Sequence, residues 1–248
     1  MRIIKLFFSF FTRIPINVEN FSLEDIGKNF HLVIFIGYFF GVIGYIFVKL
    51  LCIYPLLSST ITIFIIEYLN SFQHFDGLLD FGDAWMSFNN KLDALKDKYI
   101  GVGGFAFGFF ITLISIISYS YFITNSLIYY IFIIEVLNKL SMISCATFGN
   151  PQPSGSGRYI VKNCSLKNLM YGLILVLPLI LINKEVIFLI ICSVIVGYIL
   201  SRYANKNLSG VNGDILGASN EINRAVISFL IIFSNNIYID VLTFFNSF

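Results

Sequence analysis

The sequence predicts an all-α fold: a polytopic membrane helix bundle with six to seven transmembrane helices and cytoplasmic polar loops. Of its 248 residues, 57% are hydrophobic and 12% are charged, whereas a soluble domain carries about 25% charged residues. Apolar runs near the ~20 residues that cross a bilayer recur along the chain. Apolar and polar residues do not alternate within these runs, which favours helices over a barrel.

Residues 1–30 are the predicted entry to the membrane. The opening MRIIKLFFSFFTRIPI is a short apolar run with basic flanks. A signal peptide needs a longer apolar run and a small-residue cleavage site, and neither is visible. An interfacial amphipathic helix that ends near Pro15 fits the pattern better.

Seven apolar runs follow, and three polar stretches at 73–100, 149–168 and 205–224 divide them. The predicted spans are His31 to Tyr54, Pro55 to Ser71, Gly101 to Thr124, Leu127 to Phe148, Leu169 to Ile182, Val186 to Ala204 and Ala225 to Phe245. Polar residues interrupt the last run, so it either spans or breaks into two shorter helices. No linker or repeat is visible, and we expect one integral membrane domain, residues 1–248.

Basic residues set the expected orientation. With the N-terminus inside, most of the 16 Lys and Arg residues fall in residues 1–30, in the three polar stretches or at Arg202. Arg224 belongs to this set, whereas Lys49 and Lys184 fall outside and Lys139 lies within a span. The positive-inside rule therefore places all three polar stretches on the cytoplasmic face of the cell membrane.

Charge and cysteine content exclude other classes. The net charge is only +2 and no basic stripe with interleaved aromatics is visible, so nucleic acid is not an expected partner. The four cysteines Cys52, Cys145, Cys164 and Cys192 are scattered without a CxxC pair. We interpret them as reduced, small apolar residues.

Acidic residues concentrate in the first polar stretch. Asp76, Asp80 and Asp83 are spaced i, i+4 and i+7, and Asp93 and Asp97 repeat the i, i+4 step. On a helix this spacing places carboxylates on one face, where they repel each other unless a cation lies among them. Oxygen ligands favour Mg²⁺ beside a substrate phosphate, held as one ion or two. A solvated acidic loop is the alternative interpretation.

Polar residues beside this cluster extend the predicted site. Glu67 and His74 continue its polar face into the second span, where an ionisable residue is functional by default. His74 is a candidate base or phosphate contact, although a structural hydrogen bond is the simpler role. Lys96 precedes a glycine-rich helix start that includes Gly103 and Gly104, where backbone amides favour a phosphate. Glycine packing between membrane helices is the alternative there.

The other two polar stretches supply further candidates. Arg158 follows a flexible Gly/Ser loop that either clamps a diphosphate or simply connects two helices. Asn212, Asp214, Asn220 and Glu221 form either another polar wall of the site or the capped entry to a helix.

The fourth predicted span also carries charge. Glu135, Asn138, Ser141 and Ser144 share one helical face, and Lys139 can neutralise Glu135 at i, i+4. These residues either pack in the interior or line a cavity, and the sequence does not separate the two roles.

These motifs resemble the cobalamin synthase family, also called adenosylcobinamide-GDP ribazoletransferases. The family carries H-x-D-G-L-x-D-x-x-D, then E-x-x-x-D before a glycine-rich helix start, then G-x-x-G-D-x-L-G-A-x-x-E. The matching segments are His74 to Asp83, Asp93 to Gly104 and Gly210 to Glu221, and the opening Phe-Phe-Thr-Arg-Ile-Pro is also similar. This chain departs from the family at Ala84, where Gly is frequent, and at Asp93, where Glu is usual. The loop around Arg158 matches poorly.

The resemblance implies a reaction of coenzyme B12 assembly. The phosphate bearing the corrinoid in adenosylcobinamide-GDP is attacked by a ribose hydroxyl of α-ribazole, or of its 5′-phosphate, and GMP leaves. Mg²⁺ is the implied cofactor. The expected partners are these substrates and the lipid bilayer, with a homo-oligomer or other corrinoid-pathway enzymes left open. The expected roles are metal binding by Asp76, Asp80, Asp83, Asp93 and Asp97, catalysis by His74, Asp83 and Lys96, and substrate binding by Glu67, Gly103, Gly104, Arg158, Asn212, Asp214, Asn220 and Glu221.

Two other functions remain open at this stage. A CDP-alcohol phosphotransferase also carries an Asp-rich motif, but it needs Ala-Arg soon after Asp-Gly, where this chain has Leu79-Asp80. A cation transporter would place its acidic residues near the bilayer midplane, whereas these gather near one face.

Overall fold

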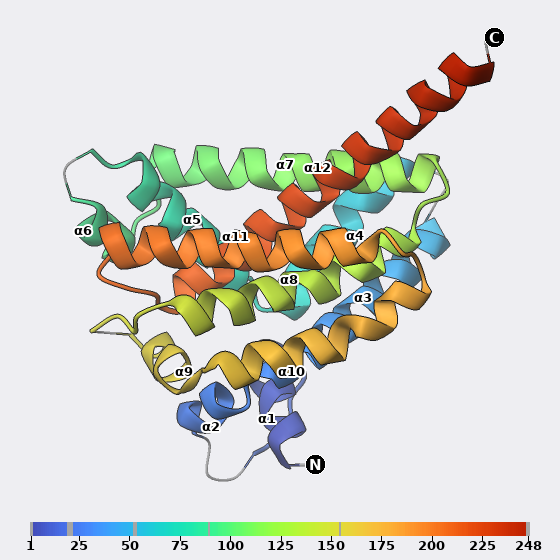
Figure 1. Ribbon diagram of the computed structural model, residues 1–248. Coiled ribbons are helices and arrows are strands. Elements are labelled where there is room, and N and C mark those ends of the chain that lie inside the picture. Colours follow the sequence, from blue (N-terminus) through green and yellow to red (C-terminus); the bar gives the residue numbers. More distant parts are fainter. Residues whose placement is uncertain (1, 19–21, 52–53, 89, 154, 247–248) are drawn as a thin grey trace.

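The chain folds into a bundle of α-helices (Figure 1). The computed structural model describes residues 2–18, 22–51, 54–88, 90–153 and 155–246, with side chains described as far as residue 235, so Cys52 lies outside it. The helices are α1 (Arg2–Phe11), α2 (Leu23–Lys28), η1 (Phe30–Leu32), α3 (Val33–Leu51), α4 (Pro55–Leu69), α5 (Gln73–Met86), α6 (Lys91–Lys96), α7 (Val102–Thr124), α8 (Tyr129–Phe148), α9 (Gly157–Asn163), α10 (Leu166–Val176), η2 (Leu177–Leu181), α11 (Val186–Asn207) and α12 (Gly213–Asn246). These ranges contain no strand, which confirms the all-α prediction.

Among the residues described, five helices are long and apolar enough to cross a membrane. They are Phe30–Leu51, α7, α8, α11 and the Gly213–Asn235 part of α12. A sixth span is obtained if α9 and the α10–η2 segment, which meet at 90°, count as one broken span. Helix α4 has 15 residues and covers about 22 Å, short of the ~30 Å hydrocarbon layer. The chain is therefore a multi-pass membrane protein.

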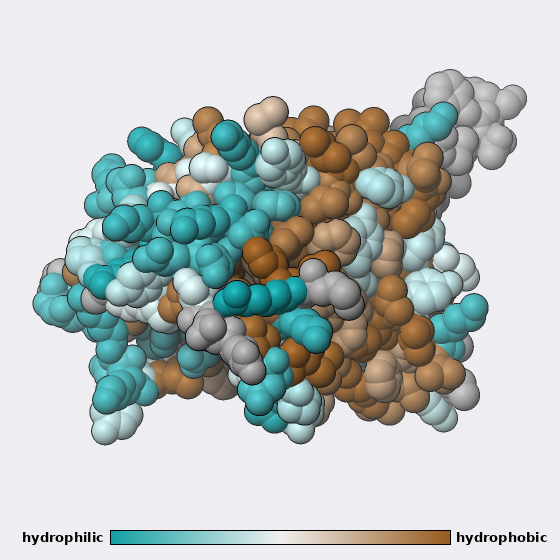
Figure 2. Space-filling model, turned by 90° about the horizontal axis from the view of Figure 1, so that it is seen from below, coloured by the Kyte–Doolittle hydropathy of each residue, from teal (hydrophilic) through white to brown (hydrophobic). Residues whose placement is uncertain are grey.

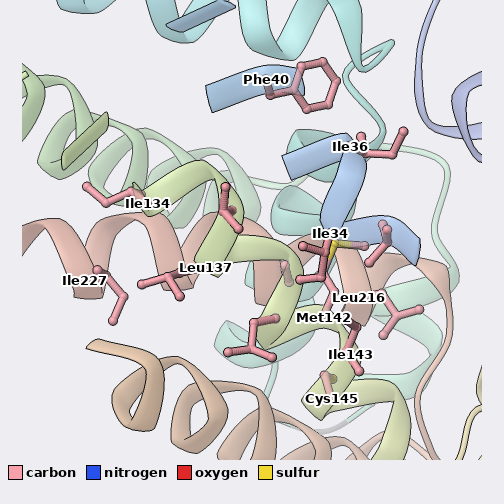
Figure 3. Packing of buried hydrophobic residues seen from close by; sticks show 14 of the residues in the cluster. Ile34, Ile36, Phe40, Ile134, Leu137, Met142, Ile143, Cys145, Leu216 and Ile227 are labelled. Carbon is pink, nitrogen blue, oxygen red and sulfur yellow. The ribbon is translucent and has the colours of Figure 1, made fainter. Parts of the chain in front are cut away.

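Helix α8 is the centre of the bundle. Most of its residues are buried, and it packs against α3, α11 and α12. Figure 3 shows Ile134, Leu137 and Ile143 of α8 among apolar side chains of its neighbours. Gly37 of α3 lies so close to α8 that a Cβ there would come within 2.8 Å of the Glu135 carbonyl oxygen. Such contacts between small residues and backbone hold membrane helices together where water provides no driving force.

The surface is divided into a polar end and an apolar remainder. Figure 2 shows hydrophilic side chains gathered on the left, the end at which α5, α6 and α9 lie in Figure 1. Elsewhere large apolar side chains face outward, among them Phe105 and Phe109 of α7 and Phe188 and Ile191 of α11. An exposed apolar surface of this extent fits contact with lipid.

Helix α12 differs from the prediction. The structure has one continuous helix from Gly213 to Asn246. Of the two alternatives left open for the run after Ala225, the break into two shorter helices does not occur, and the helix begins within the stretch that was expected to be a polar loop. Asn220, Glu221 and Arg224 lie within this helix and are buried. Counting Arg224 among the cytoplasmic loop residues was therefore wrong, because three buried carboxylates surround its guanidinium group.

Helix α1 packs against the protein. Its side chains Leu6, Phe7 and Phe11 are buried, and the helix contacts α2 and α3. The backbone that follows it is anchored as well, because Arg13 N–H donates to the Leu69 carbonyl oxygen at 2.7 Å. The apolar face that the sequence assigned to the membrane surface thus covers the bundle next to α5.

Candidate active site

Helix α5 carries the acidic motif and lies across α12. Ser71 and Phe72 have positive φ angles of 58° and 56°, which reverse the chain between α4 and α5. The two helices approach closely because Gly77 faces Asp214: a Cβ on Gly77 would come within 2.8 Å of the Asp214 Cα. Glycine after Asp76 thus allows carboxylates from α5 and α12 to meet.

A polar cavity of about 480 Å³ opens beside this crossing. Its wall takes carboxylates from three segments, two lysine side chains and two side-chain amides. The lining residues are Asp76, Asp80, Leu95, Lys96, Asp97, Lys98, Ile100, Gln152, Gly155, Asn212 and Asp214. Sequence spacing grouped Asp76 with Asp80, and Asp97 with Asp93. The fold brings Asp97 and the distant Asp214 to the same cavity as Asp76 and Asp80.

The carboxylates in this cavity repel one another. Burial, and then the charges of Asp214, Asp76 and Asp83, raise the pKa of Asp80 from its usual 3.8 to about 7. Asn212 Nδ2 donates to Asp214 Oδ2 at 2.6 Å, and this hydrogen bond stabilises the negative charge of Asp214 without neutralising it. A cation placed among these groups would remove the repulsion.

The donor set fits Mg²⁺ that arrives with a phosphate. Within the described ranges, no three His, Cys, Asp or Glu side chains are close enough to form a ready-made metal site. Mg²⁺ commonly takes one or two protein carboxylates and completes its shell with phosphate oxygens and water. Asp76, Asp80, Asp97 and Asp214 supply carboxylate oxygens around one cavity, which suits that mode of binding.

Asp83 holds the N-terminus of α7. Its Oδ2 accepts from Gly101 N–H and its Oδ1 from Gly104 N–H, both at 2.7 Å. Gly103 lies beside it, and a Cβ there would come within 2.8 Å of the Met86 Cβ. Within the glycine-rich helix start that the sequence assigned to a phosphate, the amides of Gly101 and Gly104 thus bind a protein carboxylate, which fixes α5 against α7.

Two other predicted residues lie outside the polar cavity. Asp93 is exposed and accepts from Asn90 Nδ2 at 2.5 Å. The Arg158 guanidinium donates to the Pro153 carbonyl at 2.6 Å and lies over the Tyr159 ring. It borders a neighbouring cavity of about 300 Å³ that shares Gln152 with the polar cavity.

A buried ion cluster lies deeper in the bundle. Arg224 is 1% exposed and pairs with Glu67 at 2.9 Å, with Glu135 at 2.8 Å and with Glu221. The Tyr119 hydroxyl donates to Glu135 at 2.8 Å. The cluster joins α4, α7, α8 and α12, so Glu67 and Glu221 are placed away from the polar cavity.

His74 of α5 is buried beside Lys139 of α8. Lys139 Nζ donates to Asn220 Oδ1 at 2.7 Å and lies 3.4 Å from His74 Nδ1. The i, i+4 pairing of Lys139 with Glu135 is therefore replaced by contacts between helices. Burial, and then the charges of Lys139 and Arg224, hold the pKa of His74 well below its usual 6.5. His74 is thus neutral.

Sequence reasoning missed two polar side chains of the site. Gln152 lines the polar cavity, and its Nε2 donates to the Leu208 carbonyl at 2.8 Å. Lys98 lines the same cavity. Nothing in its local pattern distinguished Gln152, whereas Lys98 lies two residues after Lys96 and could have been included.

The fold and cavity define a multi-pass membrane protein with a carboxylate-rich site at one polar end. Residues 4–232 match the family model described as cobalamin-5-phosphate synthase. Three relatives named adenosylcobinamide-GDP ribazoletransferase come from Methanococcoides burtonii, Methanosarcina mazei and Saccharolobus islandicus. Their identities are 27%, 29% and 33%, over 89%, 88% and 86% of this chain and 88%, 86% and 83% of the relative. No solved structure matches.

The chain therefore belongs to the cobalamin-5-phosphate synthase family. This membership makes it a membrane-embedded transferase of cobalamin biosynthesis, and it confirms the resemblance drawn from the three motifs.

Proposed function

We propose that this chain joins adenosylcobinamide-GDP to α-ribazole, or to α-ribazole 5′-phosphate, with release of GMP. The observation that carries the proposal is the polar cavity, in which four aspartates face two lysines and two amides. The names of the relatives support the same substrates. The cavity offers what a diphosphate needs: carboxylates for a divalent cation and ammonium groups for phosphate oxygens.

The residues that line the polar cavity would have different roles in this reaction. Asp76, Asp80, Asp97 and Asp214 would hold Mg²⁺, which when bound neutralises charge on the diphosphate. Lys96 and Lys98 would bind phosphate oxygens and stabilise the leaving GMP. A ribose hydroxyl that is free in both acceptors, and so is not the 5′-hydroxyl, bonds through its oxygen to the phosphorus that carries the corrinoid. The bond from that phosphorus to the GMP oxygen breaks, and a cavity carboxylate takes the hydroxyl proton.

Asp83 and His74 would have supporting roles in this reaction. Asp83 is bound to two α7 amides, so it positions the helix that carries Asp76 and Asp80. His74 is neutral and its Nδ1 faces Lys139, which leaves Nε2 as a hydrogen-bond donor rather than a base.

We place the polar end on the cytoplasmic side of the cell membrane. Lys96, Lys98, Arg158 and Lys162 belong to segments at this end, so the positive-inside rule supports this orientation without Arg224.

The test is GMP release by the purified protein in lipid nanodiscs. Adenosylcobinamide-GDP, α-ribazole and MgCl₂ should yield GMP, and EDTA should abolish it. Asp76→Asn and Asp214→Asn should lose turnover, whereas Glu24→Gln, which alters an exposed acid on α2, should retain it. No GMP from the wild type, with CMP released from a CDP-alcohol or ion flux in proteoliposomes, would replace the proposal with one of its rivals.

A further inference from the structure

A second cavity adjoins the polar one. It has a volume of about 310 Å³ and lies between α1, α5, α9 and the start of α12. Asp76 and Asp214 line both cavities. A molecule in the second cavity would therefore present one end to the carboxylates that face the diphosphate.

Part of the wall of the second cavity is aromatic and aliphatic. Phe10 and Phe11 come from α1, Ile160 from α9, Met142 from α8 and Leu216 from α12. Flat aromatic ligands gain stacking and dispersion contacts in such surroundings. The cavity is thus suited to a planar, apolar ring system.

His74 adds an unpaired hydrogen-bonding atom to this cavity, which Gln73, Ser156, Asp76 and Asp214 also line. The side chain lines the cavity and is 3% exposed, and its buried Nε2 has no partner among the described residues. Lys139 Nζ lies at 3.4 Å from Nδ1. A lysine ammonium group only donates, so Nδ1 accepts and Nε2 carries the hydrogen. A buried donor without a partner is costly, and a ligand acceptor would satisfy it.

We propose that this second cavity binds the benzimidazole base of the attacking riboside, while the polar cavity binds the diphosphate of the other substrate. The inference rests on the proposed function and deepens it. The dimethylbenzimidazole of α-ribazole is planar and apolar, and its free ring nitrogen is a single acceptor that matches the unpaired Nε2 of His74. With the base there, the ribose hydroxyl would lie toward Asp76 and Asp214, which border both cavities.

Other parts of the substrates fit this cavity less well. Guanine carries several donors and acceptors, which the aromatic and aliphatic part of this wall would leave unpaired. A corrin macrocycle is far too large for about 310 Å³. Helix α1 would therefore be part of the substrate site. It is held to α5 in part by Gln73, whose Nε2 donates to the Phe10 carbonyl at 3.3 Å.

Two variants test the assignment by steady-state kinetics with each substrate varied in turn. Ser156→Trp places a bulky ring at an exposed position on the cavity wall and should raise the KM for α-ribazole at least tenfold without changing that for adenosylcobinamide-GDP. Lys96→Ala should raise the KM for adenosylcobinamide-GDP without changing that for α-ribazole. Equal changes in both KM values for Ser156→Trp, or a change only for adenosylcobinamide-GDP, would overturn the proposal.

A base analogue tests the role of His74 separately. The indole riboside has a C–H in place of the free ring nitrogen, so the wild type should bind it about tenfold more weakly than α-ribazole, the value of one hydrogen bond. His74→Phe should abolish this preference. An unchanged preference in the variant would overturn the contact. Direct binding by ribazole fluorescence needs no turnover, so absence of GMP release from the wild type would refute the proposed function without deciding this inference.

Discussion

The molecule contains two groups of carboxylates that differ in how their charge is balanced. Around Arg224, the carboxylates Glu67, Glu135 and Glu221 each contact the guanidinium group and are buried. At the polar end, Asp76, Asp80 and Asp214 line an open cavity, and their mutual repulsion raises the pKa of Asp80. The buried carboxylates have Arg224 as their counter-ion. The cavity carboxylates repel one another, as expected of a site that binds a cation.

This difference indicates which acidic residues hold the fold and which serve chemistry. A buried charge whose partner is removed costs several kcal/mol, so the Arg224 cluster must be intact for α4, α8 and α12 to pack. Repelling carboxylates at a surface cavity destabilise the fold and gain only from a ligand. Such strain at a cavity is a feature of functional sites.

The largest expected effect on stability follows from breaking the Arg224 cluster. Arg224→Gln leaves three buried carboxylates without their cation and should cost about 3–5 kcal/mol of unfolding free energy. The measurement is thermal denaturation in detergent micelles. Arg202→Gln is the matched control because Arg202 is exposed on α11, and it should melt with the wild type. Equal melting temperatures for both variants would show that the cluster is not a structural element.

Asp80→Asn should produce the opposite pattern. We expect turnover to fall about 10²–10³-fold, the usual loss for one electrostatic group in an active site. The melting temperature should stay the same or rise, because one of the repelling charges is removed. GMP release and thermal denaturation on the same preparation measure both effects. Full activity, or a melting temperature as low as that of Arg224→Gln, would remove the distinction between the two groups.

The fold was predictable because its signals are local. Apolar run length gave the helices, and the i, i+4, i+7 spacing placed Asp76 and Asp80 together on the cavity wall. The Gly210 to Glu221 motif pointed to Asp214, which lines the polar cavity. These features depend on helical period and composition, which a single sequence contains.

The partners across the bundle were not predictable. Glu67 and Arg224 are 157 residues apart, and nothing in either local pattern names the other. Lys139 was paired with Glu135 by helical spacing, but packing directs it to Asn220 and His74. Asp83 shares the spacing of the cavity aspartates, yet the position of α7 gives it two backbone amides. Helix packing decides these contacts, and one sequence does not report it.

The smallest expected effect is a pH dependence of stability that Mg²⁺ removes. The folded-state pKa of Asp80 is about 7, above its usual 3.8, so between these values the folded protein binds more protons than the unfolded chain. Stability from this group is therefore full below about pH 4 and is lost as pH rises through 7. Without Mg²⁺, the melting temperature should fall between pH 5 and pH 8, and Asp80→Asn should flatten this slope.

Magnesium distinguishes a ligand site from simple repulsion. If the cavity carboxylates bind the ion, adding MgCl₂ should raise the melting temperature more at pH 8 than at pH 5, because protonated carboxyl groups are poor ligands. The rise should shrink in Asp80→Asn but persist in Arg202→Gln. An equal rise at both pH values, or one unchanged in Asp80→Asn, would show that the ion binds elsewhere, because only carboxylates that are deprotonated and left unpaired by the fold gain from a cation in this way.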